Sequence, residues 1–230
     1  MIVAIIPARG GSKRIPRKNV REFCGRPMIA WPIETAIRSK LFDRIIVSTD
    51  DPEIMKVATA AGAEAPFTRP TQLSDDHTPT VPVVRHSVNW LEDSGCPVKM
   101  ACCIYPTAPF LQSDYLTEGL NTLRASTNTE FAFSVTSFEF PIFRAVKLDP
   151  DNRISMFWPE HELTRSQDLP PAYHDAGQFY WGTAEAWQTR DRIFSSRAHG
   201  IVLPSHLVQD IDTLEDWKRA ELMMEVMRNE

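Results

Sequence analysis

The sequence predicts an α/β fold: a three-layer, doubly wound, mainly parallel sheet with a small inserted lobe. Short apolar runs rich in Ile and Val alternate with longer segments of helical period, which is the pattern of βαβ units. The 230 residues, 43% of them hydrophobic, suit one domain with a substantial core. We therefore expect residues 1–230 to form a single domain.

Five apolar runs are expected to form the strands of the sheet. They are Ile2–Pro7, Arg44–Ser48, Met100–Tyr105, Phe131–Val135 and Gln178–Trp181. Four segments between them carry apolar residues about one turn apart, as helices that cover a sheet would. They are Met28–Lys40, Pro52–Ala61, Val81–Glu92 and Asp114–Ala125. Pro32 removes a backbone donor inside the first of these helices, so that helix kinks there or starts later.

Two regions break the alternation of strands and helices. Residues from about 137 to 175 are Pro-rich and aromatic, and the sequence Asp149-Pro150-Asp151-Asn152 predicts the turn of a hairpin. We expect this stretch to be an inserted lobe. Near the end of the chain, Thr213 and Asp216 can form the capping box of a terminal helix. The apolar stripe of that helix is Leu214, Trp217, Ala220, Met224 and Met227.

Charge and cysteine content limit the partners that the chain can have. A net charge of −5 argues against a general nucleic-acid or anionic-membrane binder, whose affinity would depend on surplus Lys and Arg. The four cysteines show neither a CxxC pair nor the spacing of a secreted disulfide scaffold. The apolar stretch Ile2–Ile6 is too short for a signal peptide, and no segment approaches ~20 apolar residues. A cytoplasmic location, without membrane or nucleic-acid partners, is expected.

The loop after the first predicted strand reverses the acidic balance of the chain. Between Arg9 and Arg26 there are seven cations and one acid, Glu22. Gly10 and Gly11 permit dihedrals closed to other residues and let backbone N–H groups approach an anion. The carboxyl end of a first strand is also where open α/β sheets bind ligands. A polyphosphate cradle is predicted, and a solvated basic loop is the alternative.

Other motifs narrow the class of polyphosphate-binding protein. The Walker A and GxGxxG spacings are absent, as are zinc-ligand histidine pairs and a GxSxG elbow. Residues 6–13, with Pro16, Lys18 and Asn19, resemble the opening motif of sugar-activating cytidylyltransferases, the family that makes CMP-sialic acids. The resemblance continues in order through residues 47–51, 69–76, 105–110 and 209–213. It implies the Rossmann-like nucleotidyltransferase fold.

The resemblance also implies a reaction: transfer of CMP from CTP to the anomeric hydroxyl of a nine-carbon 2-keto sugar acid, with release of pyrophosphate. Residues 131–138, 164–169 and 173–182 resemble the branch whose sugar is pseudaminic acid. Tyr105 stands where N-acetylneuraminate cytidylyltransferases usually carry Gln. Synthesis of CMP-N-acetylneuraminate or CMP-Kdo remains an alternative activity, and UTP- or GTP-dependent sugar transfer is a more remote one. An alternative of another class is a regulatory nucleotide-binding protein without turnover.

Site residues follow from the resemblance. It implies that Arg9, Ser12 and Lys13 hold the triphosphate with Lys18, which would stabilise the α-phosphate as charge develops. Asn19 and Arg69 would contact cytosine or ribose. The full set expected to bind the nucleotide is Ala8, Arg9, Gly10, Gly11, Ser12, Lys13, Lys18, Asn19, Arg69, Thr78 and Thr80.

Asp210 and Asp212 are the candidate ligands of Mg²⁺. Carboxylates at i and i+2 on an extended strand point to the same side, and hard oxygen ligands with phosphate suit this metal. Asp212 could instead be only the N-cap of the helix that follows. Asp210 could take the proton of the attacking hydroxyl, so the catalytic candidates are Lys18, Arg9, Asp210 and Asp212. Asp50 and Asp51 are adequately explained as helix caps before Pro52.

The sugar carboxylate calls for a cation away from the triphosphate, and Arg165 is the candidate. The remaining residues expected to bind sugar are Tyr105, Thr107, Gln167, Asp175, Gln178 and Tyr180, although hydrogen bonds within the lobe are an alternative role for several. In the family this lobe forms the contact of a homodimer and reaches towards the partner's active site. Phe138, Phe140, Phe143, Phe157 and Trp158 could supply the interface or pack in the lobe itself.

Overall fold

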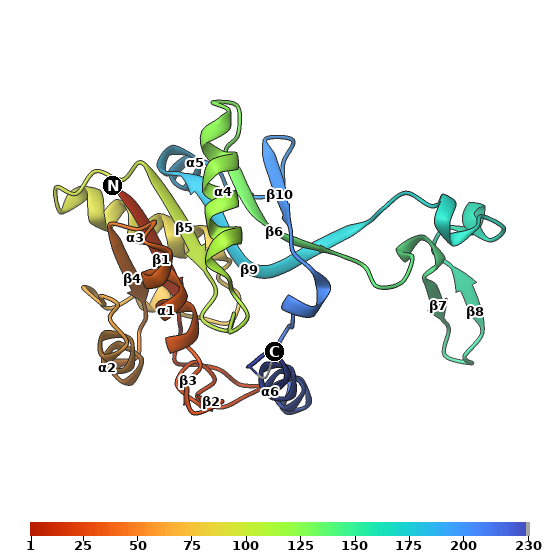
Figure 1. The fold of residues 1–230 in the computed structure, drawn as a ribbon, viewed down its shortest axis with the longest axis horizontal. Coiled ribbons are helices and arrows are strands. Elements are labelled where there is room, and N and C mark those ends of the chain that lie inside the picture. Colours follow the sequence, from red (N-terminus) through yellow and green to blue (C-terminus); the bar gives the residue numbers. More distant parts are fainter. Residues whose placement is uncertain (229–230) are drawn as a thin grey trace.

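The computed structural model describes residues 1–228, and its centre is a six-stranded sheet (Figure 1). The strand order is β10-β6-β9-β5-β1-β4. The strands are β1 (Ile2–Pro7), β4 (Arg44–Ser48), β5 (Met100–Ile104), β6 (Phe131–Ser137), β9 (Tyr173–Thr183) and β10 (Ala198–Val202). Strand β1 is parallel to β4 and β5, and β10 is parallel to β6, whereas β9 is antiparallel to both of its neighbours. The predicted mainly parallel sheet is confirmed.

Helices cover both faces of the sheet, which confirms the three layers. One face packs against α1 (Ala30–Ser39), α2 (Pro52–Ala60) and α4 (Ser113–Ala125). The other face packs against α3 (Thr80–Asp93) and α5 (Ala184–Thr189). Strand β1 shows why an uninterrupted apolar run forms this strand: Val3 and Ile5 enter one core, and Ala4 and Ile6 enter the other.

Helix α1 starts later than the predicted segment, at Ala30. Pro32 therefore lies in the first turn, where its missing N–H costs no hydrogen bond within the helix. A short pair of strands, β2 (Glu22–Phe23) and β3 (Arg26–Pro27), precedes this helix and was not predicted. Strand β10 and helix α5 were also missed.

The stretch from residue 137 to 175 carries a hairpin that stands away from the sheet at the end of β6 and β9 (Figure 1). Its strands are β7 (Val146–Leu148) and β8 (Ile154–Met156), joined by the predicted turn, in which Asn152 has φ of 61°. The 3₁₀ turns η2 (Ile142–Arg144), η3 (Pro159–His161) and η4 (Ser166–Asp168) surround it. Phe143 packs against Trp158 with ring centroids 5.5 Å apart, whereas Phe140 is 80% exposed.

Helix α6 (Leu214–Arg228) ends the described chain and packs against the region of the loop between β1 and β2, residues 8–21, which we call the first loop. Thr213 and Asp216 form the predicted capping box, because each backbone N–H donates to the other residue's side chain, at 2.9 and 3.2 Å. Trp217, Ala220 and Met224 are buried against a cluster that includes Ile15 and Phe23. The predicted stripe is wrong at Leu214, which is 56% exposed.

All four cysteines are free, and Cys102 and Cys103 are buried in β5. Within residues 1–228, no helix has both the length and the apolar character needed to cross a membrane.

Candidate active site

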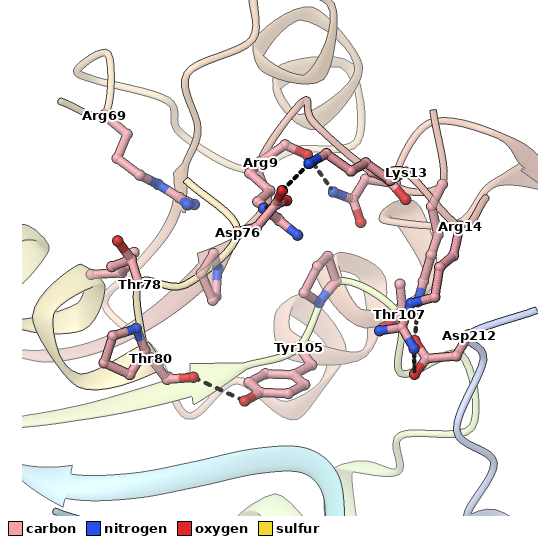
Figure 2. A pocket seen from close by; sticks show the side chains of 17 residues that line it. Arg9, Lys13, Arg14, Arg69, Asp76, Thr78, Thr80, Tyr105, Thr107 and Asp212 are labelled. Carbon is pink, nitrogen blue, oxygen red and sulfur yellow. Dashed lines mark hydrogen bonds and ion pairs between the residues drawn. The ribbon is translucent and has the colours of Figure 1, made fainter. Parts of the chain in front are cut away.

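A pocket of about 500 Å³ opens at the carboxyl ends of β1 and β5 (Figure 2). This is the edge of an open α/β sheet at which ligands bind. Its lining combines the first loop, the segment before α3, the loop after β5 and the segment before α6. The lining residues are Pro7, Arg9, Ser12, Lys13, Arg14, Lys18, Asn19, Arg69, Asp76, Thr78, Pro79, Thr80, Val83, Tyr105, Pro106, Thr107 and Asp212.

The first loop is anchored to the neighbouring strand. The backbone N–H of Ala8 donates to the Ser48 carbonyl at 2.9 Å, and that of Gly10 donates to Asp50 Oδ1 at 3.0 Å. A Cβ atom on Gly10 would lie 2.6 Å from Asp51 Oδ2, so glycine is required there for space. The predicted need for dihedrals closed to other residues was wrong, because neither Gly10 nor Gly11 has a positive φ. A Cβ atom on Gly11 would meet nothing within 4 Å.

Four cations of the first loop line the pocket. Arg9 and Lys13 both form ion pairs with Asp76, whereas Arg14 forms one with Asp212 (Figure 2). Lys18 also forms an ion pair with Asp212. The other three cations of the predicted basic segment face elsewhere: Arg17 pairs with Asp51 and Glu53, and Arg21 and Arg26 lie over tryptophan rings. Arg14 and Asp76 were missed as site residues. Both residues carried a signal in the sequence. Arg14 is one of the seven cations between Arg9 and Arg26, and Asp76 lies in residues 69–76, one of the segments that resemble the family.

Lys18 joins the first loop to the segment before α6. Its Nζ lies 3.3 Å from Asp212 Oδ1 and donates to the carbonyl of Ile211. Arg14 Nη1 donates to the other carboxylate oxygen of Asp212 at 2.5 Å. The cation-rich loop near the amino terminus therefore faces an acid from near the carboxyl terminus across one pocket.

The segment that holds Asp210 and Asp212 is irregular, so the predicted extended strand is wrong. The 3₁₀ turn η5 (Ser205–Leu207) precedes it and the capping box of α6 follows, and residues 208–212 between them belong to no strand. Asp212 is not the N-cap, because Thr213 fills that position and the Asp212 carboxylate pairs with Arg14 and Lys18. Asp210 is exposed and lies outside the pocket lining.

The chemistry of the two acids fits a hard divalent cation. Although Asp210 is exposed to solvent, partial desolvation by the groups packed around its carboxylate raises its pKa, and the nearby negative charge of Asp212 raises this pKa further. Lys18 and Arg14 partly offset these effects. The charge of Asp212 acts on Asp210, so the two carboxylates lie near each other and provide oxygen ligands of the kind that Mg²⁺ prefers. No three His, Cys, Asp or Glu side chains gather as a metal cage within residues 1–228.

The nucleoside candidates come from two parts of the pocket lining: Asn19 from the first loop, and Arg69 and Thr78 from the segment before α3. Arg69 is 5% exposed, and its Nε donates to Ser48 Oγ at 3.1 Å. Burial lowers the pKa of Arg69 to about 10, so its guanidinium stays charged at neutral pH. Asn19 is buried and its Nδ2 donates to the Arg9 carbonyl at 3.0 Å, which closes the first loop. The Thr78 hydroxyl donates to Asp75 Oδ1 at 2.7 Å.

The sugar candidates do not all lie together. Tyr105 and Thr107 line the pocket, and the Tyr105 hydroxyl lies 2.9 Å from Thr80 Oγ1. Tyr180 packs behind Tyr105 with ring centroids 5.3 Å apart, and its hydroxyl donates to Asp175 Oδ2 at 2.6 Å. Burial raises the pKa of both tyrosines, so their hydroxyls remain protonated hydrogen-bond donors.

Five of the seven sugar candidates lie outside the pocket lining of their own chain: Asp175 and Tyr180, which lie behind Tyr105, and Gln178, Arg165 and Gln167. Gln178 is buried, and its Nε2 donates to the Leu207 carbonyl at 2.5 Å, which fastens β9 to the segment after β10. Arg165 and Gln167 lie in the lobe that stands away from the sheet (Figure 1). There Arg165 Nε pairs with Asp168 Oδ2 at 2.7 Å. The predicted carboxylate-binding cation thus does not reach the pocket of the same chain.

The doubly wound sheet and the cationic loop at its carboxyl edge are the arrangement of an α/β protein that binds anionic ligands. The model of the cytidylyltransferase family matches residues 3–229, and the chain belongs to this family. It is 45% identical to the pseudaminic acid cytidylyltransferase of Campylobacter jejuni, over 97% of this chain and 96% of that protein. It is 28% identical to the CMP-N,N'-diacetyllegionaminic acid synthase of Legionella pneumophila, over 98% of this chain and 97% of that one.

A solved structure of a CMP:2-keto-3-deoxy-manno-octonic acid synthetase complexed with CTP shares the fold. The TM-score is 0.72 at 18% identity, and the likeness covers 98% of this chain and 99% of that one. The family predicted from the sequence motifs is confirmed.

Proposed function

We propose that this chain transfers CMP from CTP to the anomeric hydroxyl of pseudaminic acid, giving CMP-pseudaminic acid and pyrophosphate. The 45% identity to the Campylobacter jejuni enzyme over nearly the whole of both chains supports this sugar. The observation that carries the proposal is the grouping of Arg9, Lys13, Lys18 and Asp212 around one pocket. This pocket offers cations for a triphosphate and a carboxylate beside them.

In the proposed reaction the sugar hydroxyl attacks the α-phosphorus of CTP and pyrophosphate leaves on the opposite side. The chain must neutralise the phosphates and orient both reactants. We assign Arg9, Ser12 and Lys13 to the triphosphate, with the backbone from Ala8 to Gly11 close by, and Lys18 to the α-phosphate. Because Lys18 is only 16% exposed, it would act in a partly desolvated setting where its charge is weakly screened.

The proposed metal is Mg²⁺, with Asp212 and Asp210 as ligands and phosphate oxygens of CTP completing its coordination. When bound, Mg²⁺ would stabilise negative charge on the phosphates and lower the pKa of the attacking hydroxyl. We assign Asp210 as the acceptor of the proton from the attacking hydroxyl, because its carboxylate lies near that of Asp212 at this side of the pocket.

The remaining pocket residues would bind the nucleoside and the sugar. Arg69, Asn19 and Thr78 are assigned to cytosine and ribose. Tyr105, Thr107 and Thr80 present hydroxyl groups that can hydrogen-bond the sugar substituents, and the Asp175–Tyr180 pair would support Tyr105 from behind. Gln178 is assigned a role in holding β9 in place.

We infer that two chains form a homodimer through the lobe, so that Arg165 and Gln167 serve the active site of the partner. Large apolar side chains of the lobe are exposed, which supports an interface there: Phe140 is 80%, Ile154 70% and Leu163 94% exposed. The four free cysteines support a cytoplasmic location.

Pyrophosphate release tests the proposed function. The purified chain is incubated with CTP, Mg²⁺ and one sugar at a time: pseudaminic acid, N-acetylneuraminic acid, a legionaminic acid or Kdo. We expect the highest kcat/KM with pseudaminic acid, and no release when UTP replaces CTP. A preference for another sugar by tenfold or more would contradict the assigned substrate, and release with no sugar would contradict the class of activity.

A further inference from the structure

Asp76 lies in the pocket although the proposed reaction gives it no role. Its Oδ1 accepts from Arg9 Nη1, and its Oδ2 pairs with Lys13 Nζ (Figure 2). These are two of the cations assigned to the triphosphate. One carboxylate, held through both of its oxygens, thus occupies both of the cations that the proposed function assigns to phosphate.

The turn before α3 holds this carboxylate in the pocket. Asp75 Oδ1 accepts from the backbone N–H of His77 at 2.9 Å and from that of Thr78 at 2.6 Å. The Asp75 carbonyl also accepts from Arg9 Nη1 at 2.9 Å, beside the Asp76 contact. The turn is therefore internally bonded, and its hydrogen bonds and ion pairs with the described first loop are made by the side chains of Arg9 and Lys13.

The two ion pairs are weak enough to exchange with a ligand. The side chain of Lys13 is 81% exposed and that of Asp76 is 31% exposed, so water and salt screen both pairs. The neighbouring cations hold the pKa of Asp76 below its usual value, and the carboxylate stays charged at neutral pH. A polyphosphate carries several charges against the single charge of Asp76 and competes well for the same cations.

We propose that Asp76 is an internal counter-ion of the phosphate site: it occupies Arg9 and Lys13 in the free chain, yields them to a polyphosphate, and takes them back when pyrophosphate leaves. It acts through these two cations, so it is a positioning residue that sets the affinity for phosphates. The inference rests on the proposed function for the identity of the phosphate ligands. Its expected consequence is faster release of pyrophosphate, at the cost of weaker binding of CTP.

Calorimetric titration with inorganic pyrophosphate tests this inference in the intact chain. We expect Asp76→Asn to bind pyrophosphate about three- to tenfold more tightly than the parent, because two competing ion pairs are lost while the side chain keeps its size. Asp76→Glu keeps the charge and should restore the parent affinity. Asp93→Asn removes an equal charge at the end of α3, away from the pocket lining, and should change the affinity less than about twofold.

Enzyme turnover gives a second measurement, whose result would not change if Asp76 had only a structural role. In Asp76→Asn, inhibition by added pyrophosphate should strengthen by the same factor as its binding, and the KM for CTP should fall without a gain in kcat. Unchanged or weaker pyrophosphate binding by Asp76→Asn, with an unchanged melting temperature, would overturn the inference. If Asp76→Asn melts at a lower temperature, Asp76→Ser replaces it in the same titration and is judged by the same criterion.

Failure of this inference can be told apart from failure of the proposed function. Parent turnover with pseudaminic acid but no tighter binding in the variant would refute only the role of Asp76. Tighter binding in the variant without turnover of CTP by the parent on any sugar would refute only the proposed reaction.

Discussion

Lys18 is the cation that links the two halves of the proposed site. It contacts the Ile211 carbonyl and the Asp212 carboxylate, and it is the least exposed of the cations that pair with pocket acids. If it stabilises charge that develops on the α-phosphate, Lys18→Ala should lower kcat by about 10²- to 10³-fold and raise the KM for CTP by less than about tenfold. Steady-state kinetics with varied CTP separates the two constants.

The matched control for this prediction is Arg21→Ala. Arg21 belongs to the same basic segment but lies over the Trp217 ring outside the pocket lining. Its loss should leave kcat within about twofold of the parent. An equal fall in kcat for both variants would mean that the general charge of the segment, and not the position of Lys18, matters.

At the scale of single residues, the sequence predicted the cations of the site better than the acids that pair with them. Seven positive charges within 18 positions of an acidic chain are evident in the sequence, and glycine beside them is explained by the close approach of Asp51. The partner of Arg9 lies 67 residues away, and no local pattern connects the two. Asp76 became a site residue only when the fold brought its turn beside the first loop.

At the scale of elements, strands buried on both faces were predictable because their apolar runs are continuous. Strand β10 was missed because it is an edge strand whose sequence, Ala198-His199-Gly200-Ile201-Val202, buries only Ile201 fully. The expected strand at Asp210 and Asp212 failed for a different reason. The capping box of α6 follows at once and fixes the backbone of the segment.

The capping box itself makes a stability prediction. Thr213→Ala removes the hydroxyl that accepts from the Asp216 N–H and leaves the first turn of α6 with an unpaired donor. We expect the free energy of unfolding to fall by about 1 kcal/mol in denaturant titrations. Thr117→Ala, which removes a hydroxyl bonded to the Ser113 carbonyl inside α4, should change the free energy of unfolding by less than about 0.5 kcal/mol. Equal effects of the two substitutions would contradict the capping role.

At the scale of the whole molecule, sheet topology creates the site. The order β10-β6-β9-β5-β1-β4 puts the ends of β1 and β5 side by side, and α6 returns the end of the chain to the first loop (Figure 1). Asp212 thereby meets Lys18 across 194 positions of sequence. Hydrophobic period predicts the elements, but long-range packing sets their order and the direction in which the lobe points, so neither could be predicted from local pattern.

The central claim is that an acid from near the carboxyl terminus and cations from near the amino terminus form one catalytic site. Its most direct test compares Asp212→Ala with Asp216→Asn, measuring Mg²⁺-dependent pyrophosphate release and the free energy of unfolding for each. We predict that Asp212→Ala loses at least about 10²-fold in kcat with little change in stability, whereas Asp216→Asn loses stability and keeps its turnover. Full turnover in a folded Asp212→Ala variant would contradict the account.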